Sequence, residues 1–331
     1  TPTFSWQIND STTQISTCDL IINDVVNLSF TNITNGTTFN HALTTTLAAG
    51  TFNWSVSCND SVNLNNISQT RIFTINSPPT IDSLAINTTD PTTNDTNENI
   101  TGHITSSDSN SDNVKLIYNW LLNQTSFASL IMPFENISDS TFNATKDYSN
   151  NNYNGSEIGG PTFGNTGYDG NGAFTFDGSG DFITMGDVLN PKTDDFSVSY
   201  WMNSTQTSAW RTVQKRGTGG QTTQSGWQIS GTTSFSNTVW SDGAGKYVLF
   251  SATNHGTQDG NWHHVVVTWD NSLANLSLFV DGDFKESGIK TSSPEGMSIS
   301  TSRHLTVGAA WDDASTQSQH YNGILDELVI W

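Results

Sequence analysis

The stretch that decides the fold is 261–270, Asn-Trp-His-His-Val-Val-Val-Thr-Trp-Asp, which is followed by 276–282, Leu-Ser-Leu-Phe-Val-Asp-Gly. An apolar strand precedes a short polar turn, and a second strand with alternating apolar residues then ends in Asp-Gly. This pattern predicts a long β-hairpin with one buried face.

The rest of the chain has the composition of an all-β protein. Gly, Asn, Ser and Thr are abundant, charged residues make up only 13%, and short apolar segments are separated by turn residues. No long run shows the 3.6-residue apolar period of a helix. The 331 residues are enough for two or three domains.

Charge and hydropathy exclude two classes of partner. The 31 acidic residues outnumber the 11 basic residues and give a formal charge of −20. We therefore expect no nucleic-acid partner, because nothing would displace phosphate counterions. No segment reaches the roughly 18 apolar residues that span a bilayer. The start at Thr1 without Met fits either a processed chain or a partial one, and is compatible with a removed signal peptide.

The hairpin belongs to a series of ordered motifs over about 200 residues that resembles the laminin-G-like, concanavalin A-like jelly roll. The resemblance places this domain at 129–331. The family's early glycine-rich loop is matched at 146–155, although Asn150 and Asn152 stand where it has glycines; Asn tolerates positive φ. The other motifs are Leu-Ile-Met-Pro-Phe-Glu at 130–135, the Asp-Gly-rich stretch 167–183, and the segments 196–202, 305–308 and 321–331.

Residues 1–77 resemble the immunoglobulin-like (Ig-like) repeats of archaeal and bacterial surface proteins. The resemblance rests on Gly-Thr-Phe-Asn-Trp-Ser-Val-Ser-Cys-Asn-Asp at 50–60 and on a closing strand at 70–76. Two cysteines at this spacing, Cys18 and Cys58, predict a disulfide, with two reduced core thiols as the alternative. The resemblance implies that the bridge crosses the β-sandwich.

Residues 78–128 read as a second, short or incomplete Ig-like domain. Strands are expected at 98–105 and 114–122, which are too few to close a sandwich. Its missing strands lie either beyond residue 331 or on a neighbouring subunit. The alternating run 3–8 is a candidate donor strand, and such a head-to-tail contact would build a filament.

Asn-x-Ser/Thr sequons are the second strong compositional signal. Fourteen of the sixteen precede residue 156. They predict N-glycosylation of a secreted protein; the alternative is that an Asn- and Thr-rich composition creates sequons by itself. The candidate sites are Asn9, Asn27, Asn32, Asn35, Asn53, Asn59, Asn66, Asn87, Asn94, Asn99, Asn123, Asn136, Asn143, Asn154, Asn203 and Asn275.

The jelly-roll resemblance implies a structural Ca²⁺ that joins the early loop to the last strand. The matching positions are Asp147 with Asn150 in the loop and Asp326 in the strand, and Asp181 is a nearby spare acid. Oxygen ligands on irregular loops suit Ca²⁺. The alternative is that these aspartates cap turns.

Nothing in the sequence predicts catalysis. Glucanases of related fold carry Glu-x-Asp-x-x-Glu on one strand, a pattern that is absent among the six Glu here. His263 and His264 are adjacent and would face opposite sides of a strand. Among the tryptophans, Trp201 and Trp269 are expected in the core. Trp210, Trp240 and Trp311 have polar neighbours and are candidates for stacking on sugar rings.

Together these features predict an extracellular, glycosylated structural or adhesive protein of the cell surface, such as a self-assembling filament or surface-layer subunit. The alternative is a carbohydrate-binding, lectin-like module of a larger secreted glycosidase or adhesin. The expected partners are further copies of the chain or cell-surface glycans.

Overall fold

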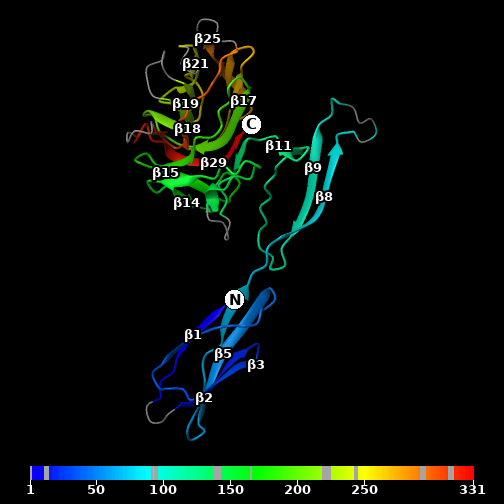
Figure 1. Cartoon of the computed structure of the whole chain (residues 1–331), viewed down its shortest axis with the longest axis vertical. Coiled ribbons are helices and arrows are strands. Elements are labelled where there is room, and N and C mark those ends of the chain that lie inside the picture. The colour runs from blue at the N-terminus through cyan, green and yellow to red at the C-terminus, as the bar shows by residue number, and fades with distance from the viewer. Residues whose placement is uncertain are drawn as a thin grey trace. The chain divides into compact units, whose positions relative to one another are not determined.

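The computed structural model divides the chain into unit 1, Thr1–Leu116, and unit 2, Ile117–Trp331 (Figure 1). It describes residues 2–10, 15–90, 92, 96–136, 143–164, 166–217, 225–241, 245–290, 296–311 and 317–331. Within these ranges, no helix has the length and apolar character needed to cross a membrane.

Unit 1 contains two layers of strands around a small core. One layer is the sheet β3-β2-β5-β6, in which β7 also pairs with β5, and the other is the pair β1-β4. Phe4, Leu20 and Val56 are buried between the layers. The strands are β1 (Thr3–Gln7), β2 (Ile15–Ile22), β3 (Val25–Thr31), β4 (Thr38–Ala42), β5 (Gly50–Asp60), β6 (Asn65–Ile67), β7 (Arg71–Ile75), β8 (Thr80–Thr88) and β9 (Ile100–Ser107).

The predicted disulfide between Cys18 and Cys58 is present. Its expected route across the sandwich is wrong, because the two residues are direct partners on the neighbouring strands β2 and β5 of one sheet. Alternation on β5 places Cys58 on the inner face with Val56, so the disulfide lies beside the core. It links two strands that are already hydrogen-bonded to each other.

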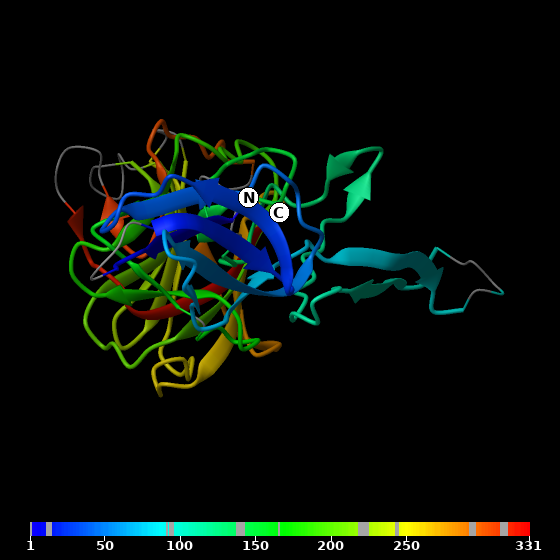
Figure 2. The ribbon, with the colours of Figure 1, turned by 90° about the horizontal axis from the view of Figure 1, so that it is seen from below.

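The run 3–8 is not a donor strand for another subunit, since β1 pairs with β4 in its own unit and Phe4 is only 3% exposed. β8 and β9 form a two-stranded hairpin (Figure 2). Leu84, Ile86 and Ile100 are exposed on it. The strand expected at 114–122 is irregular except for β10 (Leu121–Leu122).

Unit 2 stacks two eight-stranded antiparallel sheets, which confirms the predicted all-β jelly roll. The β17 sheet has the order β14-β15-β29-β17-β22-β23-β24, with β12 also paired to β29, and the β18 sheet has the order β13-β16-β26-β18-β19-β20-β21-β25. The remaining elements are β11 (Thr125–Ser126), β12 (Leu130–Met132), the 3₁₀ turn η1 (Asn143–Thr145), β13 (Ser156–Ile158), β14 (Thr162–Gly164), β15 (Ala173–Asp177), β16 (Phe182–Gly186), β17 (Phe196–Asn203), β18 (Trp210–Arg216), β19 (Gly226–Gly231), β20 (Phe235–Trp240), β21 (Tyr247–Ala252), β22 (Trp262–Asp270), β23 (Asn275–Val280), β24 (Asp283–Ser287), β25 (Ile289–Lys290), β26 (Leu305–Val307), β27 (Ala310–Trp311), β28 (Gln317–Ser318) and β29 (Asn322–Ile330).

The hairpin that the sequence singled out forms β22 and β23, with Val265 opposite Val280. Val265, Val267 and Trp269, which alternate along β22, enter the core between the sheets. Residues of the neighbouring strand β17 also alternate between the core and the outer face. Inward-facing Tyr200 places its hydroxyl 2.8 Å from Thr212 Oγ1 of the facing sheet. The other face of β17 and β22 therefore points away from the core.

Candidate functional site

A β-bulge in the last strand shapes the outer face of the β17 sheet. Ser199 pairs with Val329 and Trp201 pairs with Asp326, so two steps along β17 match three along β29. Within the extra step Glu327 has φ 52°, which is uncommon for a residue other than glycine. Such bulges re-aim side chains and are frequent beside functional sites.

The bulge brings Glu327 to two carboxylates from distant segments. Glu135 follows β12, Asp169 lies in the loop between β14 and β15, and one oxygen of each of the three carboxylates lies within 4.8 Å of the others. We call Glu135, Asp169 and Glu327 the carboxylate cluster. It is held in part by backbone contacts, since Gly172 N donates to Glu135 Oε2 at 3.1 Å.

Hard oxygens from irregular loops are the ligands that Ca²⁺ takes. Glu135 is buried, Glu327 is half-buried and Asp169 is exposed, so the cluster is both anchored and open to solvent. Three like charges this close repel one another unless a cation or protons neutralise them. The chemistry of the cluster therefore fits the divalent ion that the jelly-roll resemblance implies.

Asp326 lies beside the cluster and is fully buried. Its oxygens accept hydrogen bonds from Tyr168 N at 2.9 Å and from Glu327 N at 2.8 Å. Burial, with the nearby charges of Glu327 and Asp169, raises the pKa of Asp326 to about 7, although the two N–H donors act in the opposite direction. The loop approaches it so closely that a Cβ at Gly167 would lie 2.7 Å from Asp326 Oδ2.

The other three residues that were predicted as metal ligands form hydrogen bonds elsewhere in unit 2. The carboxylate of Asp147 accepts hydrogen bonds from the backbone N–H groups of Ile131, Ser149 and Tyr153 and so organises the early loop. Asn150 donates its amide to Gln124 O, and Asp181 accepts from Asp177 N. In the described part of the chain, the one group of three metal-ligating side chains is the carboxylate cluster, which contains none of the four predicted residues.

Aromatic rings cover the outer face next to the cluster. The Tyr168 ring stacks on Trp201 with centroids 3.3 Å apart and an interplanar angle of 11°, and Trp262 stands edge-on to Tyr168 at 6.4 Å. His264 lies 5.0 Å from Trp201. We call Tyr168, Trp201, Trp262 and His264 the aromatic shelf; Tyr168 forms its exposed surface, with 49% of the residue accessible.

The shelf corrects the sequence-based assignment of the tryptophans. Trp201 was expected in the core but lies half-buried on the outer face, whereas Trp269 is in the core as predicted. Trp210 is 1% exposed and Trp240 is 4% exposed, so neither ring is available to stack on a sugar. Trp311 is half-buried and packs against Phe182 at 5.3 Å.

His264 also makes a contact that the sequence did not indicate. Its Nε2 lies 2.8 Å from Ser199 Oγ, and burial lowers the pKa of His264, which favours the neutral imidazole. A Ser–His pair resembles a nucleophile and its base. Ser199, however, lies in mid-strand between β22 and β29, where backbone N–H groups join the sheet ladder instead of surrounding an oxyanion.

The predicted glycosylation sites differ in how accessible their side chains are. Asn94 lies outside the described residues, and so does the side chain of Asn143. Asn53, Asn59, Asn154, Asn203 and Asn275 are half-buried. The exposed sites are Asn9, Asn27, Asn32, Asn35, Asn66, Asn87, Asn99, Asn123 and Asn136.

Comparison with known proteins identifies the jelly roll. Residues 177–331 match the model of a family described as the concanavalin A-like lectin/glucanases superfamily. No curated protein matches the chain.

Three solved structures are similar to part of this chain. The binding domain of botulinum neurotoxin serotype C1 is 17% identical with a TM-score of 0.43; the match covers 62% of this chain and 48% of that one, so this chain spans about half of its length. The CBM40 module of a Ruminococcus gnavus sialidase, bound to α2,3-sialyllactose, is 9% identical with a TM-score of 0.34 over 42% and 77% of the two chains. A heptameric SAP-like pentraxin from Limulus polyphemus is 14% identical with a TM-score of 0.29 over 47% and 74%. At these values the likenesses carry no argument about function.

Proposed function

We propose that this chain is an extracellular surface protein whose jelly roll binds glycans at the aromatic shelf. The observation that carries the proposal is the exposed Tyr168 ring, which lies flat on Trp201 while its backbone N–H is fixed by buried Asp326. A flat, immobilised ring offers apolar contact to the C–H face of a pyranose without losing side-chain entropy on binding.

Polar groups beside the ring suit the hydroxyl edges of a sugar. Asp169 follows Tyr168 directly and is exposed, and Trp262 supplies a second aromatic edge. We further propose that Ca²⁺ binds Glu135, Asp169 and Glu327. This ion would hold the loop that carries Tyr168 against the last strand, and its charge would be available to sugar oxygens.

A binding role is favoured over catalysis because a glycosidase places its two carboxyl groups on either side of the scissile bond. The cluster instead groups three acids around one point. The disulfide supports an oxidising, extracellular compartment. The many sequons agree with a secreted surface protein.

A glycan array with matched tyrosine variants tests the proposal. Tyr168→Ala should weaken binding by about tenfold or more, corresponding to about 1.4 kcal/mol of lost stacking. Tyr118→Ala is the control, because Tyr118 is also 49% exposed but lies outside the shelf. Tyr168→Phe should retain binding. Equal effects of the two alanine substitutions, or no glycan bound by the wild type, would refute the role of the shelf.

A second candidate function, self-association, is favoured by the β8–β9 hairpin. Leu84, Ile86 and Ile100 are 60–67% exposed on a hairpin that pairs with no further described strand. Isolated two-stranded hairpins are marginally stable, so a second copy of the chain would gain by covering this face. Sedimentation at rising concentration should show oligomers that Leu84→Lys abolishes; a monomer at every concentration would exclude the assembly.

A further inference from the structure

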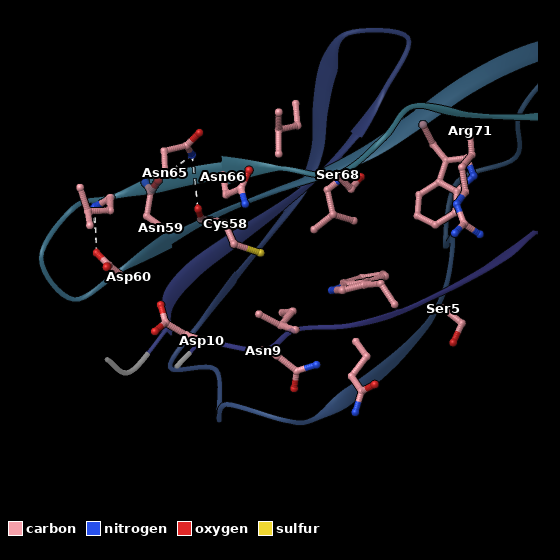
Figure 3. A pocket seen from close by; sticks show the side chains of 17 residues that line it. Ser5, Asn9, Asp10, Cys58, Asn59, Asp60, Asn65, Asn66, Ser68 and Arg71 are labelled. Atoms are coloured by element: carbon pink, nitrogen blue, oxygen red, sulfur yellow. Dashed lines mark hydrogen bonds between the residues drawn. The ribbon is translucent and has the colours of Figure 1, made fainter. Parts of the chain in front are cut away.

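Unit 1 has an open groove between its two layers. A pocket of about 640 Å³ lies between the β1 segment and the edge formed by β5 and β6 (Figure 3). Its apolar lining includes Trp6, Ile8, Trp54 and Val56, and its rim is rich in asparagine. This volume is within the range of about 300–1,000 Å³ typical of small-molecule sites.

The groove is open because the layers differ in width. β1 pairs only with β4 among the described strands, whereas β5 has β2 on one side and β6 and β7 on the other. The wider sheet therefore extends past the edge of β1. Trp6 and Trp54 remain half-buried there, in contrast to fully buried Phe4.

One sequon asparagine points into this groove. Asn66 lies directly opposite Cys58 in the β5–β6 register, and partners in an antiparallel pair project from the same face. Cys58 faces inward to its disulfide with Cys18, so the Asn66 side chain also faces the space between the layers (Figure 3). Asn66 is nevertheless exposed, because no strand covers it.

The amide of Asn66 is available, in contrast to that of Asn59, another sequon residue that lines the groove. No described residue forms a hydrogen bond with it. Asn59 Oδ1 accepts from Asn65 Nδ2 at 2.7 Å.

Trp6, one of the residues that line the groove, carries a donor that lacks an acceptor. Trp6 Nε1 is buried and has no hydrogen-bond partner among the described residues. Most buried N–H groups in proteins are paired, so this indole calls for an acceptor that the described chain does not supply. A ligand with both an apolar face and oxygen acceptors would satisfy the lining.

We infer that Asn66 carries an N-linked glycan whose first sugars fold back into this groove and cover Trp6 and Trp54. Sugar C–H faces pack on the indoles, and hydroxyl or acetamido oxygens meet the polar rim and Trp6 Nε1. The glycan covers the part of the wider sheet that extends past the edge of β1, and thereby closes the groove between the two layers.

The attachment requires a sugar donor activated as a glycosyl diphosphate. The Asn66 amide nitrogen forms a bond to C1 of the sugar, the bond from C1 to the diphosphate oxygen breaks, and one amide proton is released as the diphosphate departs. The transfer is performed by the cell's glycosylation machinery, and the chain contributes the sequon Asn66-Ile67-Ser68.

The test combines glycopeptide mass spectrometry with hydroxyl-radical footprinting of protein secreted from a host that glycosylates Asn-x-Ser/Thr. Asn66 should be modified, and Asn66→Gln should raise the labelling of Trp6 and Trp54 several-fold. Asn87→Gln removes another exposed sequon, on β8, and should leave the labelling of both tryptophans unchanged.

Three results would overturn the inference. The first is an unmodified Asn66, and the second is a modified Asn66 whose loss by substitution leaves Trp6 and Trp54 labelling unchanged. The third is protection of the tryptophans that rises with protein concentration, because this would identify a second copy of the chain as the occupant. Since glycan-array binding at the shelf is measured separately, failure here leaves the proposed function intact.

Discussion

Calcium is expected to reverse the effect of one substitution in the carboxylate cluster. Glu327→Gln removes one of three carboxylates whose oxygens lie within 4.8 Å of one another. For one pair at 4.8 Å, repulsion at an effective dielectric constant of about 20 is about 3.5 kcal/mol before solvent screening. Because Asp169 is exposed, solvent screening reduces this gain. In the presence of a chelator we therefore expect Glu327→Gln to raise the melting temperature of unit 2.

In the presence of calcium, we expect Glu327→Gln to have a lower melting temperature than the wild type. An ion present at about 100 times its dissociation constant stabilises the folded state by about 2.7 kcal/mol. For a unit of about 200 residues this corresponds to a rise in melting temperature of roughly 5–10 °C. The wild type should show this rise, and Glu327→Gln should lose most of it because it removes a charged ligand.

Scanning calorimetry with excess chelator and with excess calcium measures both effects. Asp181→Asn is the matched control, since Asp181 is a buried acid of the same unit that lies outside the cluster. Its calcium-dependent shift should equal that of the wild type. The reasoning fails if calcium does not shift the wild-type melt, if Glu327→Gln destabilises the ion-free protein, or if Asp181→Asn abolishes the shift.

Further predictions concern stability. Replacing both Cys18 and Cys58 by Ala should cost unit 1 about 4 kcal/mol in the chain-entropy model, given the separation of 40 residues; an unchanged denaturation midpoint would contradict this. Asp187→Asn should lower the free energy of unfolding by about 3 kcal/mol, because the fully buried Lys215 Nζ loses the charged carboxylate 2.6 Å away. This value is at the low end for a buried ion pair because the Asp187 side chain is 45% exposed. The hydrogen bond from Lys215 lowers the pKa of Asp187. The contribution of this pair is therefore full above the pKa of the unfolded carboxyl and is lost as pH falls through the lower folded pKa, so urea melts of wild type and Asp187→Asn should converge in acid.

The jelly roll could be predicted because its strands obey a simple period. In 261–282 apolar residues alternate on one face, and register follows once that face is buried. The same period also places Trp201 on the outer face. Phe196, Val198, Tyr200 and Met202 alternate into the core, so Trp201 between them had to face outward.

The route of the disulfide was not available from the sequence. A spacing of 40 residues is compatible with strands that face each other or with strands that lie side by side. The choice depends on sheet order, and here β2 and β5 are neighbours. The polar neighbours of Trp210 and Trp240 wrongly indicated exposed rings. Exposure also depends on how the sheets pack, and β18 and β20 are almost entirely buried, polar residues included.

The carboxylate cluster could not be predicted because it depends on a break in the period. Regular alternation would put Asp326 and Leu328 on one face and Glu327 on the other. The bulge instead leaves Asp326 facing the loop under Tyr168 and returns Leu328 to the core. No local signal marks a left-handed glutamate inside an apolar strand. Such a conformation costs about 1–3 kcal/mol and persists only where the surroundings impose it. A non-glycine residue held in this way at the meeting point of three distant segments is therefore the strongest structural reason to place the functional site of unit 2 there.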